Sequence, residues 1–208
     1  MPLLARVPPG RAGRLWLRRR TATAQRGQEQ LDRKLRVLVP EALRRREQME
    51  RSLRTWEQTC AEAQTWLLRA SVISGQDAVR HALPSAPTSV ELVWATAVGV
   101  TFPTDALLVE PELRTGAPVA NAAVAPAVEA FRAALQAGAQ AACDERAVHL
   151  VESEVAVTRR RLRALEKRWL PWLEDALRTL ELTLEQTEQE DTMRRRRAGA
   201  ASPDRGRP

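Results

Sequence analysis

The 208-residue sequence contains no tyrosine, only 4% aromatic residues and nine glycines. Strands of β-sandwiches and β-barrels are rich in aromatic and β-branched residues and are joined by glycine-containing turns, so this composition argues against an all-β fold. The two cysteines, Cys60 and Cys143, lie far apart and match neither a disulfide framework nor a zinc module. This cysteine usage fits a reducing compartment best.

Long apolar runs are also missing. The first 13 residues contain no apolar segment of the length that a signal peptide needs. The most apolar stretches, 90–102 and 117–128, are shorter than the roughly 20 residues that span a bilayer. We therefore expect a soluble chain without secretion or direct membrane insertion.

The familiar catalytic motifs are absent from the sequence, which contains no GxxxxGK[ST], GxSxG, HExxH or GxGxxG pattern. His81 and His149 are isolated histidines without a ligand-spaced companion. Acidic pairs such as Glu188 and Glu190 are interpreted as solvated helix faces, because a general acid or base needs a cleft that shifts its pKa. The sequence therefore predicts a non-catalytic protein with no cofactor and no metal.

What the sequence does have is two long segments with few helix breakers. Between residues 14 and 74 the only glycine or proline residues are Gly27 and Pro40, and between residues 140 and 197 the only one is Pro171. Six of the 13 prolines lie between residues 84 and 126. This distribution predicts a long helix, a broken middle and a second long helix.

Each long segment carries a narrow apolar seam in which spacings of three and four residues alternate, as in a coiled coil. Because no third apolar helix is present to cover them, we predict an all-α fold: a long antiparallel two-helix coiled coil with a short β-hairpin and a small helix and loop region mid-chain. The first seam is Leu31, Leu35, Leu38, Ala42, Met49, Leu53, Trp56, Cys60, Ala63, Leu67 and Ala70, and the second is Val155, Thr158, Leu162, Leu165, Trp169, Leu173, Leu177, Leu180 and Leu184.

The seams also give local predictions. Trp56 and Trp169 are expected in the core. Three consecutive four-residue steps from Leu165 to Leu177, with Pro171 among them, predict a kink or local straightening. If Arg11 lies near residue 195 across the hairpin, Cys60 and Cys143 fall within one turn of each other as a reduced pair.

The middle of the chain and its ends complete the predicted organisation. The run from Val90 to Pro103 suits a short hairpin with Gly99 at the turn or at a bulge. It is followed by a loop at 113–121, an alanine-rich helix at 122–142, and a tail from Arg194 that is frayed or disordered. The predicted segments are an N-terminal extension (1–13), a first coiled-coil helix (14–80), a middle insert with the hairpin (81–121), a second helical segment (122–197) and a disordered tail (198–208).

Arginine outnumbers lysine 31 to 2, and the formal net charge is +7. Because consecutive helical residues are about 100° apart, an arginine run forms a collar of charge around its helix. Such clustering is also typical of nucleic-acid binding, but acidic residues are interspersed and no stacking aromatics lie among the clusters. We therefore expect no nucleic-acid partner. Trp16 and Trp172 are candidate anchors for a protein partner.

Four blocks of the sequence together resemble the D-subunit family of V/A-type ATPases. They are VPPGRAGRLWLRRR from Val7, AQRGQEQLDRK from Ala24, VGVTFP from Val98 and TRRRLRALEKRWLPWLEDALRTLE from Thr158. The family's C-terminal helix carries a similar T-R-R-R-x-x-A-L-E followed five residues later by proline. Departures are Arg163, where the family commonly has asparagine, and Pro40, whose effect on the first helix is not decided by the sequence.

The resemblance implies a central-stalk rotor that transmits torque between a catalytic A/B hexamer and the membrane rotor ring, coupling ATP turnover to ion transport. It implies contacts with the F subunit and with a membrane-ring adaptor, a cytoplasmic location at the membrane periphery, and a hairpin associated with stimulation of hydrolysis. The partner-contact residues that it suggests are Arg18, Arg19, Arg26, Gly27, Gly99, Thr158, Arg159, Arg160, Arg161, Ala164, Leu165, Glu166 and Pro171.

Two other functions stay open at this point. One is the stalk of a related rotary or export motor, although an export stalk would not need the insert at 90–126 and a γ subunit of an F-type rotor would need a larger middle domain. The other is a basic coiled-coil nucleic-acid-binding protein, whose binding would weaken steeply with salt.

Overall fold

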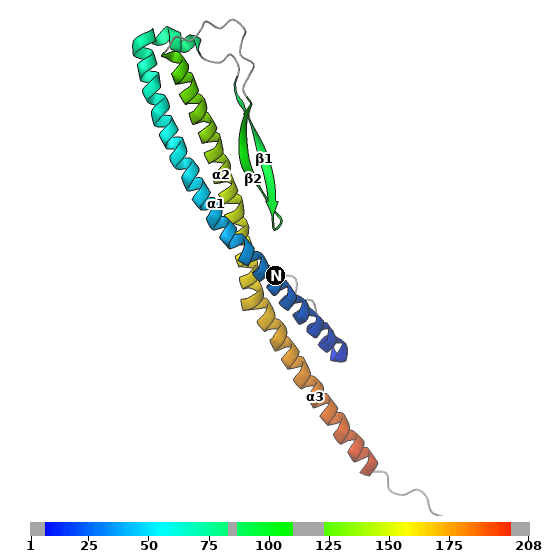
Figure 1. Cartoon of the computed structure of the whole chain (residues 1–208). Helices are drawn as coiled ribbons and strands as arrows, with labels where there is room; N and C mark the ends of the chain where they lie inside the picture. The colour runs from blue at the N-terminus through cyan, green and yellow to red at the C-terminus, as the bar shows by residue number, and fades with distance from the viewer. Residues whose placement is uncertain (1–6, 83–86, 110–122, 201–208) are drawn as a thin grey trace, which may run out of the picture. The chain divides into compact units, whose positions relative to one another are not determined.

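The computed structural model describes residues 7–82, 87–109 and 123–200. The elements, in order, are α1 (Gly10–His81), β1 (Ser89–Ala97), β2 (Val100–Val109), α2 (Val124–Ala164), a π-helical turn η1 (Leu165–Trp169) and α3 (Leu170–Ala200) (Figure 1). This architecture confirms the predicted all-α coiled coil with a short hairpin. The loop predicted at 113–121 lies outside the described residues. Within those residues, none of the helices has the length and apolarity needed to cross a bilayer.

The chain divides into two compact units, which we call the terminal unit (residues 1–33 and 158–208) and the central unit (residues 34–157). Helices α1 and α2 each contribute to both units. The hairpin of β1 and β2 belongs to the central unit alone.

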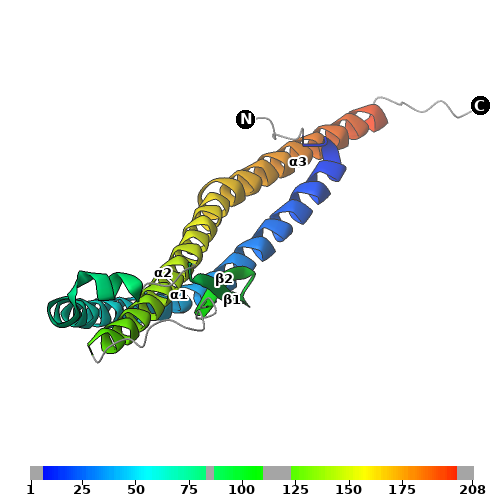
Figure 2. The ribbon, with the colours of Figure 1, turned by 90° about the horizontal axis from the view of Figure 1, so that it is seen from above.

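In the terminal unit, the beginning of α1 packs antiparallel to η1 and α3. Leu17, Ala24, Leu170 and Leu173 form its buried apolar cluster. Pairs that join the two sides run in opposite directions along the chain: Arg11 with Glu188 at 3.0 Å, Arg18 with Glu181 at 2.6 Å, and Gln28 with Glu166 at 3.2 Å. Figure 2 shows the blue end of α1 beside the orange part of α3.

The second predicted seam is confirmed, because all of its nine residues are buried or half-buried. The irregularity expected near Pro171 is present as η1, in which the backbone N–H of Leu170 donates to the carbonyl of Leu165. Proline has no N–H to donate to the preceding turn. The wider π-helical turn directly before Pro171 accommodates this gap without ending the helix.

In the central unit, α1, α2 and the hairpin meet around one apolar cluster. Its buried members are Leu38, Val100, Phe102, Ala147, Val151 and Val155. Lys34 and Glu154 form a half-buried ion pair at 2.7 Å across the two helices, and Arg46 and Glu152 form another at 2.6 Å. The hairpin runs alongside α2 (Figure 1). The hairpin thus packs on the two helices, which supplies the support that a two-stranded hairpin needs.

The hairpin turn consists of Val98 and Gly99, which have φ values of 51° and 75°. Two residues with positive φ give the primed turn that matches the twist of a two-residue hairpin, and glycine adopts it without steric cost. The predicted turn at Gly99 is confirmed, and the strands extend further than the predicted range. A bulge opposite Trp94 places both Pro103 and Thr104 against one residue of β1.

Helix α1 continues through Pro40. The carbonyl of Arg36 thus loses the N–H that would normally bond to it in a helix. The break in α1 lies instead at Gly75, whose φ of 75° and ψ of 165° are non-helical. At the other end, α3 extends to Ala200, so the prediction of a frayed tail from Arg194 is wrong for residues 194–200.

Two seam predictions in the central unit are wrong. Trp56 is 41% exposed, and a methyl group added at Gly138 would lie 2.8 Å from its indole nitrogen, so the ring lies over Gly138 at the surface. Because Trp56 faces Gly138 in an antiparallel pair, Cys60 lies opposite about residue 134, roughly 13 Å along the helix from Cys143. The two thiols are free, and this register does not make them a pair.

Candidate functional site

The structure gathers the predicted partner-contact residues in one unit. Twelve of the thirteen belong to the terminal unit, and only Gly99, at the hairpin turn, belongs to the central unit. Arg159, Arg160 and Arg161 are all exposed near the end of α2. Segments separated by more than 120 residues of chain are thus brought together in a single compact part of the molecule.

Most of these side chains are on the surface. Arg18, Arg19 and Arg26 are exposed on α1, as are Ala164, Glu166 and Pro171 on the opposing side. Arg18 is paired with Glu181, whereas Arg26 donates to the carbonyl of Ala22 at 3.2 Å. The surface that they form is rich in guanidinium groups.

Three predicted contact residues instead serve internal packing. Thr158 is 1% exposed, so its side chain is not accessible on the surface of this chain. Leu165 is half-buried against the apolar cluster of the terminal unit. Gly27 lies across from it, and a methyl group added at Gly27 would be 4.0 Å from a methyl carbon of Leu165.

Charge is distributed unequally between the units. The terminal unit contains 21 Lys and Arg residues against 11 Asp and Glu residues, a formal net charge of +10. The central unit contains 12 against 15, a formal net charge of −3. The basic character of the chain is therefore a property of the terminal unit, which suits an acidic binding partner.

One arrangement of the terminal unit was not anticipated from the sequence: Arg20 lies beside Trp16 and Trp169, and Trp169 stacks on Trp172. The Arg20 guanidinium carbon is 5.8 Å from the ring centre of Trp16 and 5.9 Å from that of Trp169, and the rings of Trp169 and Trp172 stack with centres 5.3 Å apart. All three rings are half-buried and Arg20 is exposed. We call Trp16, Arg20, Trp169 and Trp172 the Trp–Arg cluster.

A second arrangement not anticipated from the sequence fixes the hairpin to α2. The Gln140 amide accepts from the backbone N–H of Ala106 at 3.2 Å and donates to the carbonyl of Thr104 at 3.4 Å. Gln136 donates to the carbonyl of Ala106 at 2.7 Å. Two glutamines thus occupy the outer edge of β2 in place of a neighbouring strand. The signal in the sequence is polar residues spaced by four at 136, 140 and 144 in an alanine-rich helix.

Asp144 supports this arrangement from within the helix pair. It is 2% exposed, and its Oδ1 accepts from Gln140 at 3.2 Å. Its Oδ2 is buried without a hydrogen-bond partner among the described residues. The ion–dipole contact with Asp144 holds the Gln140 amide in the orientation that the edge of β2 requires.

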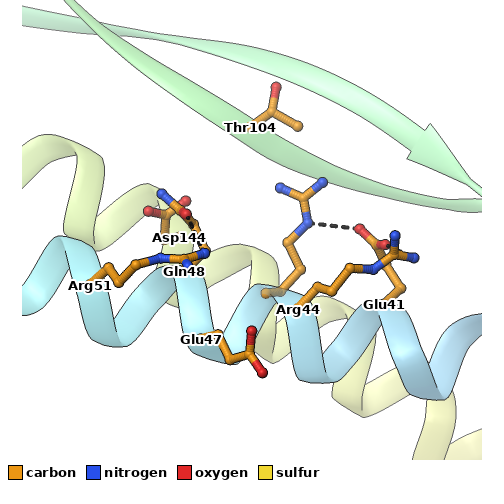
Figure 3. Close-up of a pocket in the computed structure, with 8 residues that line it drawn as sticks. Glu41, Arg44, Glu47, Gln48, Arg51, Thr104 and Asp144 are labelled. Atoms are coloured by element: carbon orange, nitrogen blue, oxygen red, sulfur yellow. Dashed lines mark hydrogen bonds and ion pairs between the residues drawn. The ribbon is translucent and has the colours of Figure 1, made fainter.

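A polar cleft of about 370 Å³ lies over this region, and Figure 3 shows Asp144 beside Gln48 with Thr104 on the hairpin above them. Glu41 pairs with Arg44 at 2.9 Å and with Arg45 at 2.8 Å. The cleft holds neither a histidine nor a cysteine, and its charges balance. The lining residues are Glu41, Arg44, Arg45, Glu47, Gln48, Arg51, Thr104 and Asp144. This chemistry suits structural ion pairing better than proton transfer.

The residue before Asp144 is Cys143, whose side chain is 3% exposed. Burial raises the pKa of this thiol, and the negative charges of Asp144 and Asp105 raise it further against an opposing effect of Arg45. A raised pKa disfavours the nucleophilic thiolate. In the described part of the chain, no group of three or more His, Cys, Asp or Glu side chains is placed to hold a metal ion.

These features define a helical hairpin protein with an arginine-rich terminal unit and a β-hairpin that is hydrogen-bonded to α2. The sequence model of the family described as the D subunit of ATP synthase matches residues 15–200, and the chain belongs to that family. It is 32% identical to the V-type ATP synthase D subunit of two Thermus thermophilus strains over 222 aligned residues, covering 99% of this chain and 96% of theirs. It is 27% identical to the V-type ATP synthase D subunit of Thermotoga neapolitana over 194 residues, covering 92% of this chain and 96% of the relative.

Proposed function

We propose that this chain is the central-stalk rotor subunit of a V/A-type ATPase or ATP synthase. It transmits torque between a catalytic A/B hexamer and a membrane rotor ring, and so couples ATP turnover to ion transport. The observation that carries the proposal is the family match over residues 15–200, which includes both long helices and the hairpin. In this role the chain is non-catalytic, needs no cofactor and works at the cytoplasmic periphery of the membrane.

The terminal unit is the part that we assign to the hexamer. Its formal charge of +10 and the exposed arginines at 159–161 present positive charge around the helices, which suits a partner that surrounds them. Nucleotide turnover on the hexamer subunits changes the shape of the cavity that they enclose. Off-centre contact with the helices then converts this change into rotation, and the arginines favour particular stopping angles.

Two features within the units suit a part that carries torque. The paired helices are joined by apolar packing and by ion pairs at intervals, such as Arg18 with Glu181 and Lys34 with Glu154. The π-helical turn keeps the helix continuous across Pro171. Helices tied along their length resist twisting better than a single helix.

The central unit is the part that we assign to the remaining partners, the F subunit and the membrane-ring adaptor. Near the break at Gly75 it exposes Leu68, Val72 and Ile73, with exposed fractions of 69%, 85% and 72%. Exposed aliphatic residues grouped at one helix end are typical of a protein interface. We assign this group to the adaptor, whereas the hairpin turn at Gly99 is assigned to the stimulation of hydrolysis.

The decisive experiment is purification of the tagged chain from its native cell. We expect a nucleotide-binding hexamer of alternating A and B subunits to co-purify in stoichiometric amount, with ATPase activity. Recovery of nucleic acid without any ATPase subunit would contradict the proposal and favour a basic nucleic-acid-binding protein.

A first prediction concerns the arginines at the end of α2. Replacing Arg159, Arg160 and Arg161 together by glutamine removes three positive charges from the terminal unit, so we expect weaker binding to the A/B hexamer by about tenfold or more. Titration calorimetry and torque-coupled ATP turnover measure the two effects. The control is a variant in which glutamine replaces Arg36, Arg54 and Arg146. It removes the same amount of charge from exposed sites of the central unit. Unchanged affinity and turnover in the first variant would remove the arginines from the mechanism.

A further inference from the structure

The Trp–Arg cluster joins three half-buried rings and one exposed guanidinium around the π-helical turn. Indole rings below a guanidinium hold it by cation–π attraction and limit its side-chain freedom. The guanidinium carbon lies 5.8 and 5.9 Å from two ring centres, near the outer limit of this attraction, and the side chain is exposed, so its N–H donors are accessible to a partner. Among the residues that the structure describes, Arg20 makes no ion pair, unlike Arg18 two residues earlier. The rings therefore hold the Arg20 guanidinium in place, and among the described residues no carboxylate is paired with it.

We propose that the Trp–Arg cluster is the receptor for a carboxylate-bearing loop of a protein partner. The Asp or Glu carboxylate of that loop accepts two parallel hydrogen bonds from the Arg20 guanidinium, and the apolar part of the loop packs on the ring of Trp172. The proposal rests on the proposed function, in which the partner is the A/B hexamer.

Charge and composition favour this occupant. A terminal unit with a net charge of +10 attracts acidic surfaces over a distance of about one Debye length, roughly 8 to 10 Å. Tryptophan and arginine are the residue types most enriched among those that contribute strongly to protein–protein binding. A phosphate backbone would meet the same arginines, but the rings of Trp169 and Trp172 stack on each other and are half-buried, so they do not form the row of separate rings on which successive bases stack.

The position of the cluster strengthens the argument. Trp169 ends η1, and Trp172 directly follows the exposed Pro171. A π-helical turn adds one residue to a helical turn and rotates the following side chains, and such turns are frequently found at functional sites. Trp169 and Trp172, three residues apart at the end of this turn, are neighbours on the helix surface, and their rings stack with Trp169 beside Arg20.

The test measures binding of single-residue variants to the purified A/B hexamer by titration calorimetry. We expect Arg20→Gln to weaken binding at least about tenfold, because a charged and desolvated contact is lost. Arg20→Lys keeps the charge but not the paired donors, so its affinity should lie between those of the wild type and Arg20→Gln. Trp172→Ala should also weaken binding, and Trp172→Phe should restore most of it. The matched control is Arg178→Gln, which removes one charge from a 75%-exposed side chain of the same unit.

The outcomes separate the two proposals. If the wild-type chain fails to bind the hexamer, the proposed function fails and this inference fails with it. If the wild type binds and Arg20→Gln binds equally well, or if Arg178→Gln is as weak as Arg20→Gln, the cluster is not the receptor and the proposed function is unaffected. A duplex DNA of about 20 base pairs, which is about two helical turns, serves as the competing probe, and tighter binding to DNA than to the hexamer would overturn the assignment of a carboxylate. Thermal unfolding of each variant checks that the fold is kept, which we expect for the Arg20 variants because that side chain is exposed.

Discussion

Cys143 is a buried residue whose surroundings decide its chemistry. Burial and the nearby carboxylates raise the pKa of its thiol, so the thiol stays protonated at a pH at which an exposed cysteine ionises. We predict that iodoacetamide at about pH 8 modifies Cys60, which is half-exposed, and leaves Cys143 unmodified in the folded chain. Peptide mass spectrometry checks this, with the urea-unfolded chain, in which both thiols react, as the control. Equal modification of both cysteines in the folded chain would contradict it.

The raised pKa of the Cys143 thiol also makes the free energy of unfolding depend on pH. In the unfolded chain the Cys143 thiol ionises near its ordinary pKa of about 8.5, whereas in the folded chain it ionises only at higher pH. Its contribution to the free energy of unfolding is therefore fully present below about pH 8.5 and is lost as the pH rises above that value.

Single residues are also where sequence-based prediction was least reliable. Trp56 has the spacing of a seam residue, but Gly138 opposite it lacks a side chain, and the ring lies at the surface. The spacing of one helix contains no information about which residue faces it. Asp144 is a related case, since a buried carboxylate is recognised only when its neighbours are known, and Gln140 and the hairpin edge come from separate segments.

The hairpin is the element whose attachment can be tested most directly. Gln140→Ala removes the hydrogen bonds of the Gln140 amide to the Ala106 N–H, the Thr104 carbonyl and Asp144 Oδ1, whereas the Ala106 N–H keeps its bond to Asp105 Oδ1 at 2.9 Å. We predict a local loss of about 1 to 3 kcal/mol, because buried polar groups then lack hydrogen bonds. Hydrogen exchange of peptides covering β1 and β2 should accelerate, while exchange in α3 should not change.

The matched control for this prediction is Gln64→Ala, the same substitution at an exposed position of α1 in the same unit. It should leave exchange in the hairpin unchanged. If Gln140→Ala also leaves it unchanged, the apolar contacts of Val100 and Phe102 together with the Gln136 bond to Ala106 hold the hairpin in place without Gln140.

At the scale of elements the sequence was informative where a local signal decides the structure. Alternating steps of three and four identify the second seam, because burial of that face is the main source of stability for a paired helix. Gly99 marks the hairpin turn through its positive φ. The three four-residue steps from Leu165 to Leu177, with Pro171 among them, located the irregularity. Whether the backbone responds by a kink or by a π-helical turn depends on packing against the start of α1. The extent of α3 was underestimated, since arginine-rich segments also form helices.

At the scale of the whole molecule, the affinity for a charged partner and the stability of the fold depend on salt in different ways. The ion pairs within the units are mostly exposed, and an exposed pair contributes only about 0.2 to 1 kcal/mol, whereas apolar burial contributes far more. The charges that give the terminal unit its net +10, by contrast, all attract the same acidic partner. Salt should therefore affect binding much more than folding.

We predict that raising NaCl from about 0.1 M to about 0.5 M changes the Tm by no more than about 4 °C. Over the same range the affinity for the A/B hexamer should fall at least about tenfold, because the attraction of the arginines is screened. Circular dichroism melting and titration calorimetry on the same samples measure the two quantities. The Arg159, Arg160 and Arg161 to glutamine variant should show a weaker dependence of affinity on salt than the wild type. A large fall in Tm together with affinity would mean that the ion pairs joining the helices, such as Arg18 with Glu181, hold the fold itself rather than adding to its apolar packing.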